Sequence, residues 1–195
     1  MIIDPKIIKE MREKTGAGVM EIKRALSESS GNEKEAIDIL RKSGQKIAAK
    51  KQDRQTAQGL IGSYIHSNGR VAALVEVGCE TDFVARNKEF RELAHDLAMQ
   101  VAATNPSYLK PEDVPEKVLE KEKEIGRECL KKEGKPKEII ERIIQGKMNK
   151  FYEEVCLLKQ PFIKDEKKTV EQLVAEKIAK LGENIQIKRF VYFSI

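Results

Sequence analysis

Hydrophobic residues near the start of the chain recur at helical spacing in three short runs. Asp4 followed by Pro5 is typical of a helix start, because the carboxylate caps free amides and proline already has a helical φ. Gly16 and Gly18 interrupt the pattern and permit a tight turn before the second run. Asn32, with a glutamate three residues on, predicts the N-cap of a third helix. The pattern therefore predicts a compact module of three helices, near the lower size limit for independent stability.

The pattern then changes to the alternating and β-branched runs that are typical of strands. Residues 59–67 and 70–79 form two such runs, joined by Asn68-Gly69. Asn-Gly between strands is a strong hairpin signal, and we expect a turn with positive φ at both of its residues. A polar break follows the second run, and a regular helical pattern begins only at Asn87, a possible N-cap. The middle of the chain therefore predicts a hairpin that leads into a helix.

Two more helical runs follow in a strongly charged part of the chain. The apolar face of the first comprises Val118, Ile125 and Cys129. This helix is expected to end around Gly134, and Pro136 is expected to open the next one. Cys129 and Cys156 fall on or beside the apolar faces, which predicts that both are small core residues.

The end of the chain completes an α+β fold. Residues 170–181 form a last helical run, and residues 185–193 alternate as a terminal strand that should pair with the hairpin. We expect a three-helix amino-terminal module with a basic linker at residues 1–53. An α+β core domain with a small antiparallel sheet and surrounding helices should occupy residues 54–195. A small sheet leaves free edges, and dimerisation is one way to cover them.

Phe83 lies between the predicted hairpin and the following helix, directly after Asp82. One interpretation is that its ring folds back and fills the core. The other is that the ring stands at the surface as an anchor for a partner, because buried aromatic side chains dominate binding energies. The pattern alone leaves both interpretations open.

Two other segments have a functional and a structural interpretation. Val19 and Met20, beside the glycine turn, either contact a partner or fill the core of the three-helix module. The basic run at residues 41–54 has no stacking aromatic residues, so a solvated helix end fits it better than a nucleic-acid site.

The composition favours a binding protein over an enzyme. The three cysteines have no C-x-x-C spacing, and the chain has only 2 histidines, which argues against a disulfide framework or a zinc site. No phosphate-binding glycine loop, serine elbow or metal-binding histidine pair is present in the sequence. The net charge of +5 permits an acidic partner without requiring nucleic acid. We therefore expect no catalytic residue, no bound metal and no cofactor.

The apolar runs are too short for a signal peptide or a membrane span. We therefore expect a cytoplasmic protein with reduced thiols and without a membrane partner.

Two motifs in this sequence are similar to the signatures of one protein family. Thr15-Gly16-Ala17-Gly18, followed by an apolar residue and a methionine, resembles the amino-terminal signature of bacterial elongation factor Ts. Residues 81–87, reading TDFVARN, match the central signature of that family. The resemblance continues through residues 159–162 and 182–185 to Arg189-Phe190, so it covers essentially the whole chain. The chain departs from many relatives at Val19, where they carry methionine.

The resemblance implies a guanine-nucleotide exchange factor for the GTPase elongation factor Tu, without covalent chemistry. It also implies a ubiquitin-associated-like fold for the amino-terminal module. The segment that intrudes into the partner comprises Thr81, Asp82, Phe83 and Val84. Phe83 would act as the wedge that disturbs the Mg²⁺ site and phosphate loop of the partner, so that GDP leaves and GTP enters. Supporting contacts are expected from Val19, Met20, Arg86 and Asn87.

The chain resembles the short members of the family, which form homodimers. The expected partners are therefore elongation factor Tu, in its GDP-bound and nucleotide-free forms, and a second copy of this chain. No direct contact with nucleic acid is expected. The competing interpretation is a basic RNA- or ribosome-associated module without exchange activity, which rests on the basic run at residues 41–54.

Overall fold

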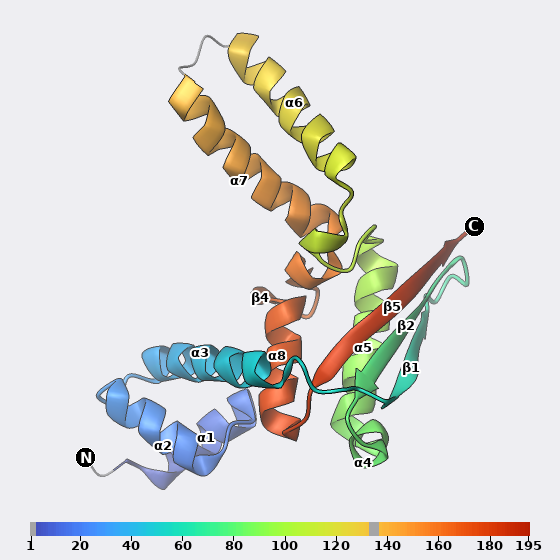
Figure 1. Cartoon of the computed structure of the whole chain (residues 1–195). Coiled ribbons are helices and arrows are strands. Elements are labelled where there is room, and N and C mark those ends of the chain that lie inside the picture. Colours follow the sequence, from blue (N-terminus) through green and yellow to red (C-terminus); the bar gives the residue numbers. More distant parts are fainter. Residues whose placement is uncertain (1–2, 133–136) are drawn as a thin grey trace.

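The computed structural model describes residues 3–132 and 137–195 and shows a mixed helix and sheet fold (Figure 1). The chain begins with three helices, α1 (Pro5–Thr15), α2 (Val19–Glu28) and α3 (Glu33–Lys51). The predicted caps are confirmed: Asp4 accepts a hydrogen bond from the amide of Lys6 at 2.8 Å, and Asn32 accepts one from that of Lys34 at 3.1 Å. These helices enclose a hydrophobic core of their own, made of Ile8, Met11, Ile22, Ala25, Leu26 and Ala36.

A three-stranded antiparallel sheet forms the centre of the molecule. Its strands β1 (Gln58–Ile65), β2 (Val71–Cys79) and β5 (Ile185–Ser194) lie in the order β1-β2-β5. The terminal strand therefore pairs with the hairpin, as predicted, and it does so through β2. Helix α5 (Lys88–Thr104) covers one face of this sheet, and its fully buried side chains include Phe90, Leu93, Leu97 and Val101.

The turn of the hairpin differs from the prediction. Gly69 has a positive φ of 66°, whereas Asn68 does not share that conformation. The amide of Gly69 donates to the carbonyl of His66 at 2.8 Å, and the amide of Arg70 donates to Oδ1 of Asn68 at 2.9 Å. The prediction of two positive φ values was wrong because the connection is longer than two residues, so one left-handed glycine is enough to reverse the chain.

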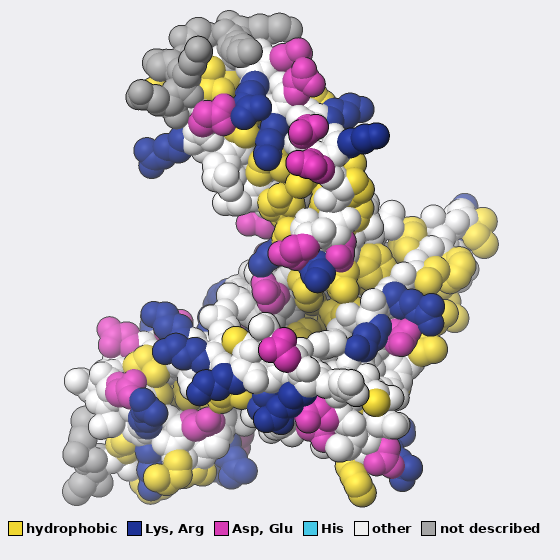
Figure 2. Space-filling model, viewed as in Figure 1, with side chains coloured by type: hydrophobic (Ala, Val, Ile, Leu, Met, Phe, Trp, Pro, Cys, Tyr) yellow, Lys and Arg dark blue, Asp and Glu magenta, His cyan; other side chains and the backbone are white. Residues whose placement is uncertain are grey.

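The opposite face of the sheet lacks a covering helix among the described residues and carries exposed apolar side chains. These are Ile61, Ile65, Leu74, Val191 and Phe193. The strand register places them together, because Leu74 pairs with Val191 and Ala72 pairs with both Ile65 and Phe193. Figure 2 shows hydrophobic side chains gathered over the outer part of the strands. We refer to these five residues as the open sheet face.

Helices α6 (Glu116–Lys132) and α7 (Lys137–Val155) form an arm that projects from the rest of the molecule (Figure 1). The predicted apolar stripe of α6 was wrong: Ile125 is 47% exposed and Cys129 is exposed. The buried positions are instead Gly126 and Leu130, one residue further along. Gly126 has no side chain, so Ile144 of α7 packs directly against the backbone there. Because of this contact, the buried face of α6 is the one with Gly126 and Leu130, and Cys129 lies outside the core.

The remaining predictions for the arm concern Cys156 and the helix boundaries at Gly134 and Pro136. Cys156 is buried, as predicted. The predicted helix end at Gly134 and helix start at Pro136 fall outside the described residues. Two short 3₁₀ turns, η1 (Pro111–Asp113) and η2 (Leu157–Lys159), flank the arm.

A small hairpin and the last helix complete the fold. Strands β3 (Pro161–Phe162) and β4 (Asp165–Thr169), which the pattern did not predict, pair antiparallel and lead into α8 (Val170–Leu181). Helix α8 lies between α3 and the sheet, so it connects the three amino-terminal helices to the rest of the molecule (Figure 1). In the parts of the chain that the structure describes, no helix is both long and apolar enough to cross a membrane.

Candidate functional site

The segment after β2 forms a short helix that the sequence pattern did not predict. Helix α4 (Asp82–Arg86) begins after Thr81, whose hydroxyl accepts a hydrogen bond from the amide of Val84 at 3.5 Å. Asn87 ends α4 and also caps α5 by accepting from the amide of Glu89 at 2.8 Å. The N-cap predicted at Asn87 is therefore confirmed, although helical structure begins five residues earlier, at Asp82. A helix this short shows no periodicity in sequence and is marginal without tertiary contacts.

Phe83 stands out from α4 into solvent. Its side chain is 80% exposed, which excludes the interpretation that the ring fills the core. The two following residues, Val84 and Ala85, are partly buried and pack against the main hydrophobic core. The helix is therefore fixed on one side by apolar packing while it presents an aromatic ring on the other. Exposing such a ring forgoes a large hydrophobic gain, so a role in binding accounts for it better than a role in folding.

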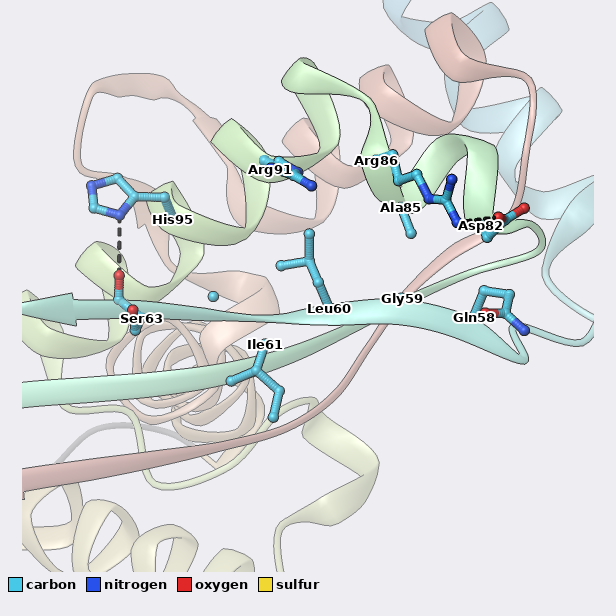
Figure 3. A pocket seen from close by; sticks show the side chains of 11 residues that line it. Gln58, Gly59, Leu60, Ile61, Ser63, Asp82, Ala85, Arg86, Arg91 and His95 are labelled. Carbon is cyan, nitrogen blue, oxygen red and sulfur yellow. Dashed lines mark hydrogen bonds and ion pairs between the residues drawn. The ribbon is translucent and has the colours of Figure 1, made fainter.

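Charged side chains surround the base of α4. Asp82 and Arg86 form an ion pair at 2.9 Å, one helical turn apart. A shallow groove runs beside this pair, between α4, the start of α5 and the outer edge of β1 (Figure 3). Arg91 and His95 line it further along, and Nδ1 of His95 lies 3.1 Å from the carbonyl oxygen of Ser63. His95 is exposed.

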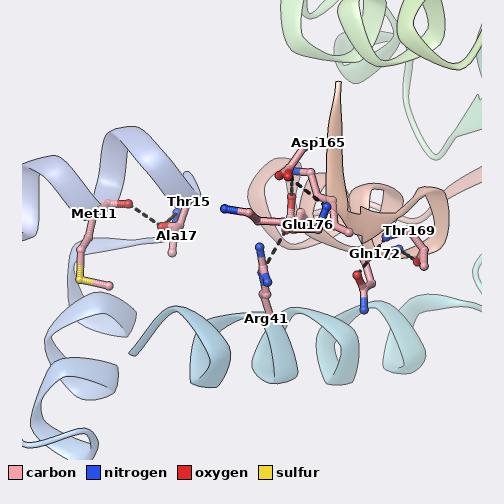
Figure 4. A network of polar contacts seen from close by, with 10 residues as sticks. Met11, Thr15, Ala17, Arg41, Asp165, Thr169, Gln172 and Glu176 are labelled. Carbon is pink, nitrogen blue, oxygen red and sulfur yellow. Dashed lines mark hydrogen bonds and ion pairs between the residues drawn. The ribbon is translucent and has the colours of Figure 1, made fainter. Parts of the chain in front are cut away.

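Val19 and Met20 form a second exposed apolar site. Val19 is 38% and Met20 is 76% exposed, so neither fills the core of the three helices. The turn before them is fixed by Thr15, whose hydroxyl donates to the carbonyl of Met11 at 2.7 Å and accepts from the amide of Ala17 at 3.3 Å (Figure 4). Helices α2 and α4 both lie at the lower side of the molecule in Figure 1, on either side of α8.

Sequence reasoning missed one residue that holds the candidate site. The carboxylate of Glu183, which follows α8, accepts hydrogen bonds from the amide and hydroxyl of Thr81 at 3.0 and 2.6 Å. It also accepts one from the amide of Glu80 at 3.1 Å. The only signal in the sequence was that Glu183 lies in a segment resembling a known family. Its contact with Thr81 joins residues too far apart in the chain for any local pattern to reveal.

The thiol beside α4 is poorly suited to nucleophilic catalysis. Cys79 is buried at the end of β2, and its Sγ contacts the carbonyl oxygen of Thr81 at 3.1 Å. Burial, with a further contribution from the negative charge of Glu183, raises the pKa of the Cys79 thiol to about 11. Its reactive thiolate is therefore scarce near neutral pH. Within the described ranges, no group of three or more His, Cys, Asp or Glu side chains is arranged to hold a metal ion.

Comparisons with known proteins all give one family name. The family model described as "Elongation factor TS" matches residues 3–195. Elongation factor Ts of Thermosipho melanesiensis is 55% identical over 194 residues, covering 100% of this chain and 99% of that protein. The proteins of the same name from Maridesulfovibrio salexigens and Thermodesulfovibrio yellowstonii are 54% and 53% identical, each over 100% of this chain and 95% and 97% of their own lengths.

The fold presents an exposed aromatic ring on a short helix that packs against the main hydrophobic core. The matches over the full length of the chain then specify which protein class this is. The chain belongs to the elongation factor Ts family, and it is a translation elongation factor of protein biosynthesis.

Proposed function

We propose that this protein promotes the release of GDP from the GTPase elongation factor Tu. The exposed ring of Phe83 enters the partner near its bound nucleotide, and with Thr81, Asp82 and Val84 it disturbs the Mg²⁺ site and the phosphate loop. GDP then leaves and GTP rebinds. The protein acts as an exchange factor in the cytoplasm, on both the GDP-bound and the nucleotide-free partner, and makes or breaks no covalent bond.

The exposure of Phe83 on an anchored helix is the observation that supports this proposal most strongly. A factor that binds the nucleotide-free state more tightly must weaken nucleotide binding by the same factor. Lowering nucleotide affinity by two to three decades requires about 3 to 4 kcal/mol of coupling. Burying one phenylalanine supplies about 1.5 to 3 kcal/mol. Phe83 therefore accounts for a large part of the coupling, and other contacts supply the remainder.

We expect those other contacts from two regions, the start of α2 and the end of α4. Val19 and Met20 offer apolar surface at the start of α2, and Arg86 and Asn87 flank the base of Phe83. We propose that residues 1–53 dock as one module while residues 54–195 carry the intruding segment. Two separate contact regions would orient Phe83 toward the nucleotide more accurately than one.

The structure weakens the RNA-binding alternative, because part of the basic run makes internal contacts. Nε of Arg41 lies 4.0 Å from a carboxylate oxygen of Glu176 on α8. The amino group of Lys51 donates to the carbonyl of Gly182, and Arg54 lies 3.5 Å from Glu80. These contacts connect α3 and the linker to the remainder of the protein, and the charges of Arg41 and Arg54 are partly balanced by carboxylates there.

Release of a fluorescent GDP analogue from elongation factor Tu, followed by stopped flow, tests the proposal. The unchanged protein should accelerate release at physiological salt, and Phe83→Ala should reduce the acceleration roughly ten- to hundredfold, the equivalent of the lost burial energy. Ile139→Ala is the matched control, because Ile139 is 49% exposed on the arm and lies in none of the proposed contact regions. Equal rates for Phe83→Ala and the unchanged protein would remove Phe83 from the mechanism. Absence of acceleration together with salt-sensitive RNA binding would favour the alternative.

We also propose that two copies of this chain associate through the open sheet face. Contiguous exposed apolar patches of this kind mark interaction sites. In a twofold dimer, the same surface of each copy contacts the other, so a single apolar patch per chain is enough to form the interface. The pair formed by Arg189 and Glu76 at 2.6 Å lies on the same face, beside the apolar residues, and provides the polar rim that interfaces commonly have.

A further inference from the structure

The corner between α8 and β5 lies directly beside the segment that carries Phe83. Strand β5 begins at Ile185, which is paired with Cys79, the last residue of β2. In an antiparallel pair, the residues that follow one strand face those that precede the other. Glu183 and Asn184 therefore face Glu80 and the start of α4, although they are more than a hundred residues away in sequence.

Glu183 holds the entrance to α4 through three hydrogen bonds. Its Oε2 accepts from the amides of Glu80 and Thr81 at 3.1 and 3.0 Å, and its Oε1 accepts from the Thr81 hydroxyl at 2.6 Å. Hydrogen bonds to a charged acceptor are shorter and about twice as strong as neutral ones. Thr81 is the N-cap of α4, so the carboxylate fixes the residue from which that helix starts.

Asn184 ties this corner to two other segments of the chain. It is buried, its amide donates to Oε1 of Glu80 at 2.6 Å, and its side-chain Nδ2 donates to the carbonyls of Gln52 and Arg54 at 3.2 and 2.8 Å. The segment between α3 and β1 is thereby tied to the corner, and Figure 1 shows it crossing the chain where α8 gives way to β5. The corner that contacts α4 is therefore also held by the segment between α3 and β1 and by Glu80 after β2.

Helix α4 depends on such a support. It spans five residues, none of which is fully buried, and a helix of this length does not persist by its own hydrogen bonds. Val84 and Ala85 hold its inner side through apolar contacts. Apolar packing restricts distance more than rotation, so the direction of Phe83 requires directional contacts as well. Glu183 supplies three of them, two at Thr81 and one at Glu80, which precede Phe83 by two and three residues.

We propose that Glu183 is a positioning residue that sets the direction in which Phe83 points. The positioning role is argued from the hydrogen bonds of the free protein. Its expected effect on nucleotide release rests on the proposed exchange function. Glu183 would contribute to the rate of nucleotide release without touching the partner. Small misplacements of a reacting or intruding group cost up to about a hundredfold in rate, so the expected effect is on the maximal rate rather than on docking.

A fluorescence experiment on the free protein tests the geometry. The chain contains no tryptophan, so the Phe83→Trp variant carries a single reporter on α4. Adding Glu183→Gln, which keeps the size of the side chain and removes its charge, should increase the fast component of time-resolved anisotropy decay. Glu171→Gln is the matched control, because Glu171 lies on α8 and bonds Lys159 at 2.7 Å, away from α4. An anisotropy decay unchanged by Glu183→Gln would overturn the inference.

Exchange kinetics test the consequence. In the chain with native Phe83, Glu183→Gln should lower the maximal rate of GDP release at least about tenfold and change the half-saturating concentration less than about threefold. Thr81→Val, which removes one hydrogen donor to Glu183, should lower the rate less, and the double variant should fall short of the product of the two effects. Circular dichroism melts identify any variant that fails to fold.

These measurements distinguish a failure of the proposed exchange function from a failure of the inference about Glu183. If the unchanged protein does not accelerate GDP release, the proposed function fails, and the exchange role of Glu183 fails with it. If the unchanged protein accelerates release but Glu183→Gln does so equally well, only the inference about Glu183 is overturned. A rise in the half-saturating concentration alone would also overturn it, because that result assigns Glu183 to docking.

Discussion

At the scale of single residues, the three cysteines differ sharply in their access to reagents. Cys79 and Cys156 are buried, and burial is the main cause that raises the pKa of each thiol to about 11. Carboxylates near each thiol raise its pKa further, since a second negative charge is unfavourable beside them. Cys129 is exposed on α6.

We therefore expect one thiol per chain to react quickly with Ellman's reagent at pH 8 and three to react after denaturation. At that pH a thiol with a pKa of about 11 is ionised on the order of once in a thousand molecules, and only the thiolate reacts. Cys129→Ser should abolish the fast phase. A fast phase that remains in the Cys129→Ser protein would contradict the burial of Cys79 and Cys156.

At the scale of elements, β1 and α5 meet through a glycine. A Cβ atom added at Gly62 would lie 2.2 Å from the carbonyl oxygen of Ala94, which is part of the backbone of α5. Neither backbone can yield without separating the sheet from the helix that covers it. Gly146 on α7 is the opposite case, since a Cβ atom there has no neighbour within 4 Å.

Alanine at these two glycines should therefore change stability in opposite directions. Gly62→Ala should lower the free energy of unfolding by about 1 to 3 kcal/mol through overpacking. Gly146→Ala should raise it by about 0.5 to 1 kcal/mol, because alanine loses less conformational freedom in a helix. Urea titrations with unchanged slopes measure both. Equal effects at the two sites would refute the close contact between β1 and α5.

Helices α5 and α8 are connected by charge as well. The carboxylate of Glu89 lies 2.7 Å from the amino group of Lys180 and 3.2 Å from that of Lys177. The hydrogen bond from Lys180 is the largest cause that lowers the pKa of Glu89 below its ordinary value of 4.5, with Lys177 adding to it against the effect of burial. A carboxyl with a lowered pKa in the folded state stabilises the fold above its unfolded pKa, and this stabilisation is lost as pH falls.

Glu89→Gln should thus lower the free energy of unfolding at pH 7, and the difference from the unchanged protein should shrink as pH falls below 4.5. Denaturant unfolding at pH 7 and pH 3 measures the two differences. Glu92→Gln on the same helix is the control, since its exposed pair with Lys88 at 3.7 Å is worth at most about 1 kcal/mol. A Glu89→Gln effect of equal size at both pH values would reject the linkage.

At the scale of the whole molecule, the sequence predicted local structure better than the contacts between distant segments. Asp4 and Asn32 were identified as caps because the signal lies within three residues. The stripe containing Cys129 was misplaced because Gly126 draws α7 close, and periodicity in one helix does not report its neighbour. Strands β3 and β4 are too short for a periodic signal.

The candidate site shows the same limit. The family signature identified the segment with Phe83, but the residue pattern left its exposure open, because exposure depends on how α4 packs on the core. Glu183 supports α4 through contacts that exist only after β2 and β5 have paired. The division at residues 53 and 54 remains a prediction, and the packing of α3 on α8 connects the two parts closely.

If the open sheet face joins two copies, light scattering should give twice the chain mass of 22.1 kDa at micromolar concentration. Leu74→Lys places a charge in the middle of the apolar patch and Phe193→Glu places one at its end, where desolvating an unpaired charge is costly, so either should yield the monomer. The side chains of Leu74 and Phe193 are already 42% and 55% exposed, respectively, so the fold of the single chain should tolerate both changes.

Ile139→Lys on the arm provides the control for Leu74→Lys, because it introduces the same charge at a similarly exposed position outside the patch and should leave the dimer intact. A stable interface usually buries about 800 Å² on each partner, which a three-stranded face can offer only if most of its surface takes part. The dimer should therefore dissociate measurably on dilution rather than persist as an obligate assembly. A mass of 22.1 kDa that does not change with concentration would reject the dimer and would leave the open sheet face for a different partner.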